Sequence, residues 1–120
     1  MSTIERLEVG ARMSEACIHN GVVYLAGQVA ADPSADVVGQ TQQVLAAIDR
    51  LLAQAGSDKS RILSAQIFLA DIADFPKMNS VWDTWVVPGA TPARATVQAA
   101  MAAPTYKVEI KVIAAQAKAF

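Results

Sequence analysis

The chain has 120 residues, of which 53% are hydrophobic and 18% charged, and its formal net charge is −1. This charge balance gives no attraction for nucleic acid or for an anionic membrane, so neither is expected as a partner. The length predicts a single domain over residues 1–120 that buries a core without disulfides or a metal. One cysteine, a charged N-terminal segment and no apolar run of membrane-spanning length together predict a soluble, cytoplasmic protein.

The first part of the sequence predicts three strands. Residues 3–9 carry enough apolar side chains for an edge strand. The dipeptide Asn20-Gly21 favours the positive φ angles of a two-residue turn, so residues 14–19 and 22–29 are expected to pair as a hairpin. Gly27, inside the second of these strands, would allow a ligand or another backbone to approach closely.

Two amphipathic helices are predicted further along the chain. Asp36 can cap a helix whose apolar residues recur at three- and four-residue spacing as far as Ala55, and Gly56 stands where a helix normally ends. A second helix is expected to begin at Asp74 with Pro76 in its first turn. Its apolar face consists of Phe75, Met78, Val81, Trp82 and Trp85.

Three more strands are predicted over residues 63–69, 93–99 and 106–114, because apolar and polar residues alternate along each segment. The last two strands are expected to pair antiparallel. In that pairing Arg94 falls opposite Glu109 on the same face of the sheet. The sequence therefore predicts a cross-strand contact between a guanidinium and a carboxylate.

The order of these elements is β-β-α-β-α-β-β, with one more strand at the start. It predicts an α+β fold in which two helices cover one face of a mixed sheet. No third helix is available to cover the opposite face. Because Ala93, Ala95 and Ala99 make the last strands small and apolar, another subunit is expected to cover that face.

Five motifs resemble the Rid proteins, the YjgF-type reactive-intermediate deaminases. They are YLAGQ at residues 24–28, LLAQAG at 51–56, DIADFPKMN at 71–79, PARATV at 92–97 and KVEI at 107–110. PARxxV followed at this distance by VEI is the most specific part of a resemblance that covers nearly the whole chain. The resemblance implies a chorismate-mutase-like fold, related to the ferredoxin-like fold, and a homotrimer with ligand clefts between subunits. It also implies hydrolysis of enamines and imines, such as 2-aminoacrylate, to 2-oxo acids and ammonia.

The resemblance also implies roles for individual residues. Arg94 is similar to the family arginine that holds the substrate carboxylate, and Glu109 to the acid that positions the attacking water. Asn79 resembles an asparagine that lines the cleft. Gly27 and Thr96 stand where family members offer backbone groups to the ligand.

Two further positions bear on the cleft. Many Rid proteins carry a tyrosine where this chain has Met13, and a methionine side chain cannot donate a hydrogen bond. A different substrate range or rate is the expected consequence. Trp82 is expected to pack in the core or at an interface, or alternatively to form a wall of the cleft.

Each candidate residue also has a purely structural explanation. Arg94 can form an ion pair between subunits, and Glu109 can belong to a solvated row of charges with the lysines two residues away on either side. Asn79 can cap or bridge at the helix surface, and Gly27 can be a bulge glycine.

The implied chemistry requires no metal and no organic cofactor. A planar guanidinium can hold the carboxylate of a 2-imino acid with two parallel hydrogen bonds. An imine held beside a water then needs mainly proton transfer, which contributes about 10²–10⁴-fold in rate. A single histidine, a single cysteine and no Gly-rich phosphate loop agree with this expectation.

Two other classes of function stay open from the sequence. The missing tyrosine fits a module that binds small carboxylates such as 2-oxo acids without turning them over. A ribonuclease or chaperone-like binder, both ascribed to relatives of the Rid proteins, is the remaining class, and only 10 Lys and Arg residues argue against its nucleic-acid form.

Overall fold

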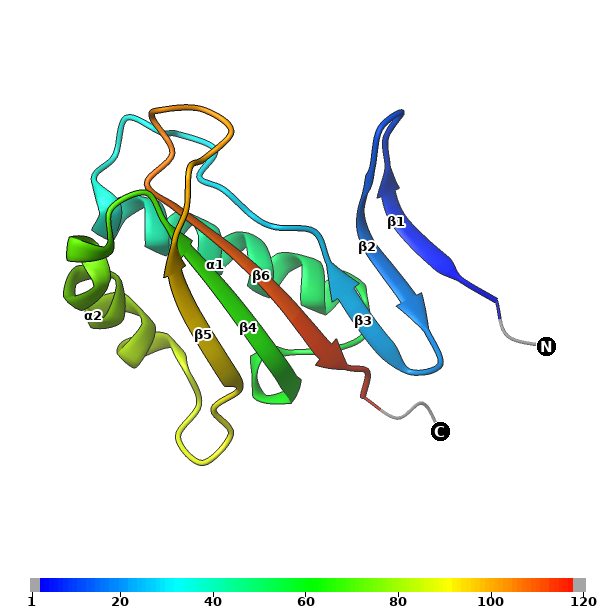
Figure 1. Ribbon diagram of the computed structural model, residues 1–120. Coiled ribbons are helices and arrows are strands. Elements are labelled where there is room, and N and C mark those ends of the chain that lie inside the picture. The colour runs from blue at the N-terminus through cyan, green and yellow to red at the C-terminus, as the bar shows by residue number, and fades with distance from the viewer. Residues whose placement is uncertain (1–2, 118–120) are drawn as a thin grey trace.

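A six-stranded sheet organises the protein, for which a computed structural model describes residues 3–117 (Figure 1). The strands lie in the order β1-β2-β3-β6-β4-β5. Their bounds are Glu5–Val9 for β1, Ser14–His19 for β2, Val22–Leu25 for β3, Ile62–Leu69 for β4, Ala93–Gln98 for β5 and Val108–Ala115 for β6. β4 and β5 run parallel and the other neighbours antiparallel, so the sheet is mixed. The predicted additional strand at the start of the chain is confirmed as β1.

Helices α1, Val37–Gln54, and α2, Phe75–Trp85, lie side by side on one face of the sheet (Figure 1). This confirms the predicted α+β architecture. The predicted cap of α1 is also confirmed, since the Asp36 carboxylate accepts a hydrogen bond of 2.9 Å from the Gly39 amide. Single-turn helices over Lys59–Arg61 and Ile72–Asp74 were not predicted. No helix in residues 3–117 has both the length and the apolarity to cross a membrane.

The core fills the space between the sheet and the two helices. Along β6, Val108, Ile110 and Val112 are fully buried and point toward the helices, as their alternation predicts. Leu45, Ile48, Leu51 and Leu52 from α1 and Met78 and Trp82 from α2 meet them in a single cluster. Residues between the buried positions of β4 and β6 consequently face the other side of the sheet, which no helix of residues 3–117 covers.

The hairpin between β2 and β3 forms as predicted, but β3 is shorter than expected. Asn20 and Gly21 have φ angles of 51° and 77°, which the two-residue turn requires. β3 ends at Leu25 instead of continuing to residue 29, and only Gln28 returns to the sheet, through a bridge to Ile110. The Ala26 amide donates to the Glu15 carbonyl at 2.9 Å, so contact with β2 continues one residue beyond the end of β3.

The predicted pairing of the last two strands is wrong. β5 pairs in parallel with β4, placing Arg94 beside Ala65, whereas β6 pairs with the other edge of β4, placing Glu109 beside Phe68. The connection over residues 99–107 is long enough to cross the end of β4, so no tight hairpin forces β5 against β6.

The pattern of β4 also departs from the prediction at one residue. A register irregularity between Ile62 and Ser64 turns Leu63 outward, and this side chain is 53% exposed. Ile62 takes the buried position instead. Ala65, Ile67 and Leu69 face the core as predicted.

Candidate functional site

Arg94 lies on the helix-covered face of the sheet, in contact with α2. Its Nη1 donates a hydrogen bond of 2.8 Å to the Asn79 side-chain oxygen. The guanidinium carbon lies 5.5 Å from the Phe75 ring centre and 5.2 Å from that of Trp82, within the range of cation–π attraction. We call these four residues the Arg94 cluster. Phe75 was expected only as a core residue, and its contact with Arg94 was not predicted.

The Arg94 cluster orients a positive charge without neutralising it. Asn79 is neutral, and Arg94 forms no ion pair with a carboxylate among residues 3–117. The side chain is exposed, so the guanidinium nitrogens that Asn79 does not occupy can reach a ligand. A planar carboxylate is the group that this free edge binds best, because two parallel hydrogen bonds form at once.

Thr96 stands two residues beyond Arg94 on the same face of β5, where it pairs with Ile67. Within the described part of the chain, its hydroxyl oxygen is the one buried side-chain polar atom that has no hydrogen-bond partner. Such an atom is costly to bury unless another molecule supplies a partner.

Glu109 and Gly27 lie in close contact on the opposite, uncovered face. Glu109 is flanked along β6 by the buried Val108 and Ile110, so its side chain projects away from the helices. A Cβ atom on Gly27 would overlap a Glu109 carboxylate oxygen and come within 2.9 Å of its carboxyl carbon. Glycine at position 27 therefore makes room for the carboxylate, which is a more specific structural role than the bulge considered as an alternative in the sequence analysis.

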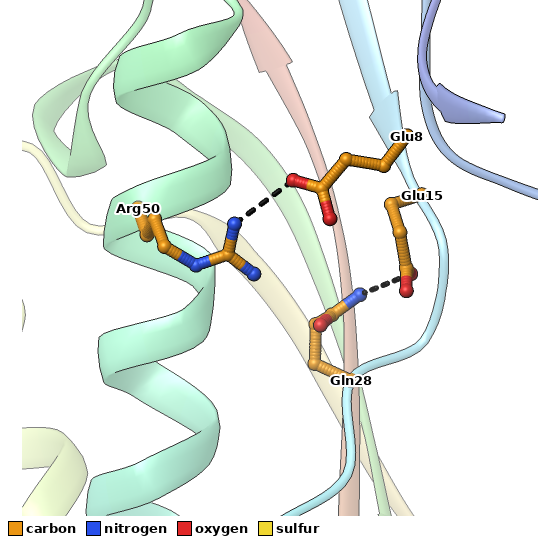
Figure 2. A network of polar contacts seen from close by, with 4 residues as sticks. All are labelled: Glu8, Glu15, Gln28 and Arg50. Carbon is orange, nitrogen blue, oxygen red and sulfur yellow. Dashed lines mark hydrogen bonds and ion pairs between the residues drawn. The ribbon is translucent and has the colours of Figure 1, made fainter. Parts of the chain in front are cut away.

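Hydrogen bonds from the next residue, Gln28, hold the chain segment around Gly27 in place. The Gln28 side-chain nitrogen donates a hydrogen bond to a Glu15 carboxylate oxygen (Figure 2), with a distance of 3.2 Å. The same nitrogen donates to the Ala26 carbonyl at 3.0 Å. Gln28 is nearly buried, so these bonds are shielded from water. Figure 2 also shows the nearby salt bridge of 2.9 Å between Arg50 of α1 and Glu8 of β1. Neither contact was predicted, because their partners are far apart in the sequence.

Within one chain, Arg94 and Glu109 do not meet. Their partners on β4, Ala65 and Phe68, are three positions apart, which corresponds to roughly 10 Å along the strand. Two strand spacings add roughly 10 Å across the sheet. The two side chains also project from opposite faces, so the predicted direct contact is absent.

Comparison with known proteins identifies the family. The profile of the family described as Endoribonuclease L-PSP matches residues 3–116. The RutC family protein YoaB of Escherichia coli is 51% identical over 113 residues, covering 94% of this chain and 98% of the relative. The crystal structure of a YjgF family member from Neisseria meningitidis matches with a TM-score of 0.95 and 45% identity, covering 98% of both chains. The chain belongs to the YjgF/Rid family.

Members of the YjgF/Rid family include a protein named for imine deamination. The 2-iminobutanoate/2-iminopropanoate deaminase of Mus musculus is 34% identical to this chain over 109 residues, which is 86% of the chain and 80% of that relative. The resemblance drawn from the five sequence motifs is therefore confirmed at the level of the family and of its fold.

Met13, the departure from the family pattern, lies in the connection between β1 and β2. Its side chain is exposed, and its carbonyl accepts a hydrogen bond of 2.8 Å from the Gly10 amide. Across residues 3–117, no three His, Cys, Asp or Glu side chains gather in a way that could hold a metal ion.

Proposed function

We propose that this YjgF/Rid protein hydrolyses reactive imines and enamines, such as 2-aminoacrylate, to 2-oxo acids and ammonia in the cytoplasm. Arg94 holds the substrate carboxylate and Glu109 positions the attacking water. The supporting observation is the state of Arg94: an exposed guanidinium, oriented by one amide and two aromatic rings, that no carboxylate of the described chain neutralises. The name of the mouse relative supports the same reaction.

The proposal includes a homotrimer with the active sites between subunits. Arg94 and Glu109 occupy opposite faces of one sheet, so one copy supplies the Arg94 cluster and its neighbour supplies Glu109 and Gly27. The uncovered sheet face carries exposed Tyr24 and Val97, apolar surface that a second copy would bury. A closed ring of identical contacts repeats the same site at every interface.

The reaction follows from this arrangement. Two guanidinium nitrogens bind the carboxylate of the imino acid and fix the imine carbon near Glu109. The carboxylate of Glu109 accepts a proton from water as the water oxygen bonds to that carbon, and this proton passes to the imine nitrogen to give a carbinolamine. Glu109 then transfers the hydroxyl proton of the carbinolamine to the amine nitrogen, so that the carbon–nitrogen bond breaks, ammonia leaves and the 2-oxo acid remains. Thr96 and Gly27 supply hydrogen-bonding groups to the ligand, and Trp82 forms a wall of the cleft.

Arg94→Ala tests this proposal. An amino-acid oxidase generates the imino acid in solution, and semicarbazide traps what the protein has not hydrolysed. We expect Arg94→Ala to lower kcat/KM by at least about 10²-fold, because the substrate loses both a charge-assisted bidentate contact and its orientation. Arg94→Lys, which keeps the charge but not the planar fork, should recover only part of the activity. Equal rates for the wild type and Arg94→Ala would reject the assignment.

A second candidate function is the binding of small carboxylates without turnover. Met13 favours it, because the hydrogen-bond donor that many relatives carry there is missing. Calorimetry would then show binding of a 2-oxo acid that depends on Arg94, with no acceleration of imine decay. Faster decay in the presence of the protein would exclude this alternative.

A further inference from the structure

A shallow concavity, which we call the interhelical groove, lies between α1 and α2. Its volume is about 280 Å³, and it opens to solvent. Leu45, Ala46 and Asp49 of α1 line one side, Val81 and Trp85 of α2 line the other, and Lys59 stands at one end. The lining combines apolar side chains with one negative and one positive charge, and it includes no member of the Arg94 cluster and neither Glu109 nor Gly27.

The two charges of the interhelical groove are arranged around one indole ring. The Trp85 ring nitrogen donates a hydrogen bond of 3.0 Å to Asp49 Oδ2. Lys59 Nζ lies 5.5 Å from the centre of the same ring. Neither Asp49 nor Lys59 forms an ion pair with another residue in the 3–117 range. Trp85 therefore holds a carboxylate at its edge and an ammonium group near its face, and both keep hydrogen-bonding capacity for a ligand.

We propose that the interhelical groove binds a free α-amino acid with an apolar side chain. At neutral pH such a molecule carries one ammonium and one carboxylate group, which complement Asp49 and Lys59 respectively. Its side chain would pack on Ala46, Val81 and the indole of Trp85. The groove volume of about 280 Å³ lies slightly below the usual range for ligand pockets, which fits a small molecule.

The exposure of the charged groups sets the expected affinity. Asp49 is exposed and Lys59 partly so, and exposed ion pairs contribute little because water competes for both charges. Binding is therefore expected at millimolar concentrations, where free amino acids can modulate a protein without permanently occupying it.

The two tryptophans of the chain provide a direct signal for occupancy. Trp85 packs against Trp82 with ring centres 5.4 Å apart, and Trp82 in turn lies 5.2 Å from the guanidinium carbon of Arg94. Calorimetry and intrinsic fluorescence with L-leucine as the probe would therefore measure binding in two independent ways.

Charge-neutralising variants test the proposal. Asp49→Asn keeps an oxygen that can accept the Trp85 hydrogen bond but removes the charge, and Lys59→Gln removes the other charge. We expect each to weaken leucine binding about three- to fivefold, and the double variant to weaken it further. Lys77→Gln, which removes an exposed charge of α2 that does not line the groove, should have no effect.

Truncated ligands show which charge contacts which group. Leucinamide lacks the carboxylate, so Lys59→Gln should not weaken its binding. 4-Methylpentanoate lacks the ammonium group, so Asp49→Asn should not weaken its binding. Arg94→Ala should leave leucine binding unchanged, which separates this groove from the proposed active site. Absence of leucine binding at millimolar concentrations, binding indifferent to both groove variants, or binding lost in Arg94→Ala would each overturn the proposal.

Discussion

The Arg94 cluster and the Glu109–Gly27 contact are built in opposite ways. Side chains from α2 surround Arg94: an amide bonds it and two rings flank it. Glu109 instead lies against a position where a side chain is missing, and the nearby backbone is held by Gln28. One region positions its charged group by added contacts, and the other by leaving space.

This difference explains why one chain keeps the two groups apart. The amide and the two rings that position Arg94 belong to α2, which covers one face of the sheet, whereas Glu109 and Gly27 lie on the uncovered face. A sheet separates the two, and alternate residues of its strands serve one face or the other. The proposed reaction therefore depends on a second copy of the chain.

The largest expected effect comes from mixing two inactive variants. Arg94→Ala and Glu109→Gln should each lose about 10²-fold or more in kcat/KM. If a site takes Arg94 from one subunit and Glu109 from its neighbour, unfolding and refolding the two variants together should create mixed trimers with one intact site each. Random mixing in equal amounts then restores about a quarter of the wild-type sites, as follows from a closed three-membered ring.

The imine-trapping assay and the mass of the refolded protein measure this outcome. Lys111→Gln, which alters the same face of β6 two residues away, should be fully active alone. If mixed trimers form but are no more active than the separate variants, the shared site is contradicted. Either both residues then act within a single subunit, or they do not belong to the same site.

A smaller effect is expected from Asn79, which tests how the Arg94 cluster orients the guanidinium. Asn79→Ala removes the 2.8 Å hydrogen bond and should raise KM about 5- to 30-fold, equivalent to about 1–2 kcal/mol. Asn79→Asp should raise KM more, because its carboxylate would compete with the substrate for Arg94. Ser80→Ala, a neighbouring exposed position on α2, serves as the control in steady-state kinetics. A weaker effect for Asn79→Asp than for Asn79→Ala would contradict an anionic substrate.

The smallest effect is expected from a substitution of Asp58, which lies outside both the Arg94 cluster and the Glu109–Gly27 contact. Hydrogen bonds from the Ser60 hydroxyl and then from the Ser60 amide lower the pKa of Asp58 below its usual 3.8. The pKa of Asp58 is lower in the folded state than in the unfolded state. The stability that results is therefore present above pH 3.8 and is lost as the pH falls through the folded-state pKa.

Asp58→Asn should therefore slightly reduce the loss of stability in acid and leave the proposed deaminase activity at neutral pH unchanged. Urea unfolding of both proteins at neutral pH and below 3.8 measures the difference. An identical acid sensitivity in the two proteins would show that the Ser60 contacts contribute nothing to folding.

Local patterns in the sequence predicted most elements of the fold but not how they pair. The Asn20-Gly21 turn, the Asp36 cap and the alternation along β6 each depend on neighbouring residues, and all three are confirmed. The placement of β4 between β5 and β6 depends on the path of the connection over residues 99–107. The local sequence of this connection indicates its length but not its path.

One buried side chain illustrates what local patterns miss. Gln40 donates to the carbonyls of Pro33, Ala35 and Thr105, each at 3.0 Å, and its oxygen accepts from the Lys107 amide at 2.9 Å. It thereby holds the segment that leads into β6 and Glu109. Helical spacing places it at the margin of the apolar face of α1, three residues after Val37 and four before Val44, but the partners of its side chain lie outside the helix.

The sequence by itself determined the family and most of the element types, because motif spacing and side-chain periodicity are properties of short segments. Tertiary structure alone decided that Arg94 and Glu109 face opposite sides of the sheet, because a face is assigned only once each strand has its neighbour and its register.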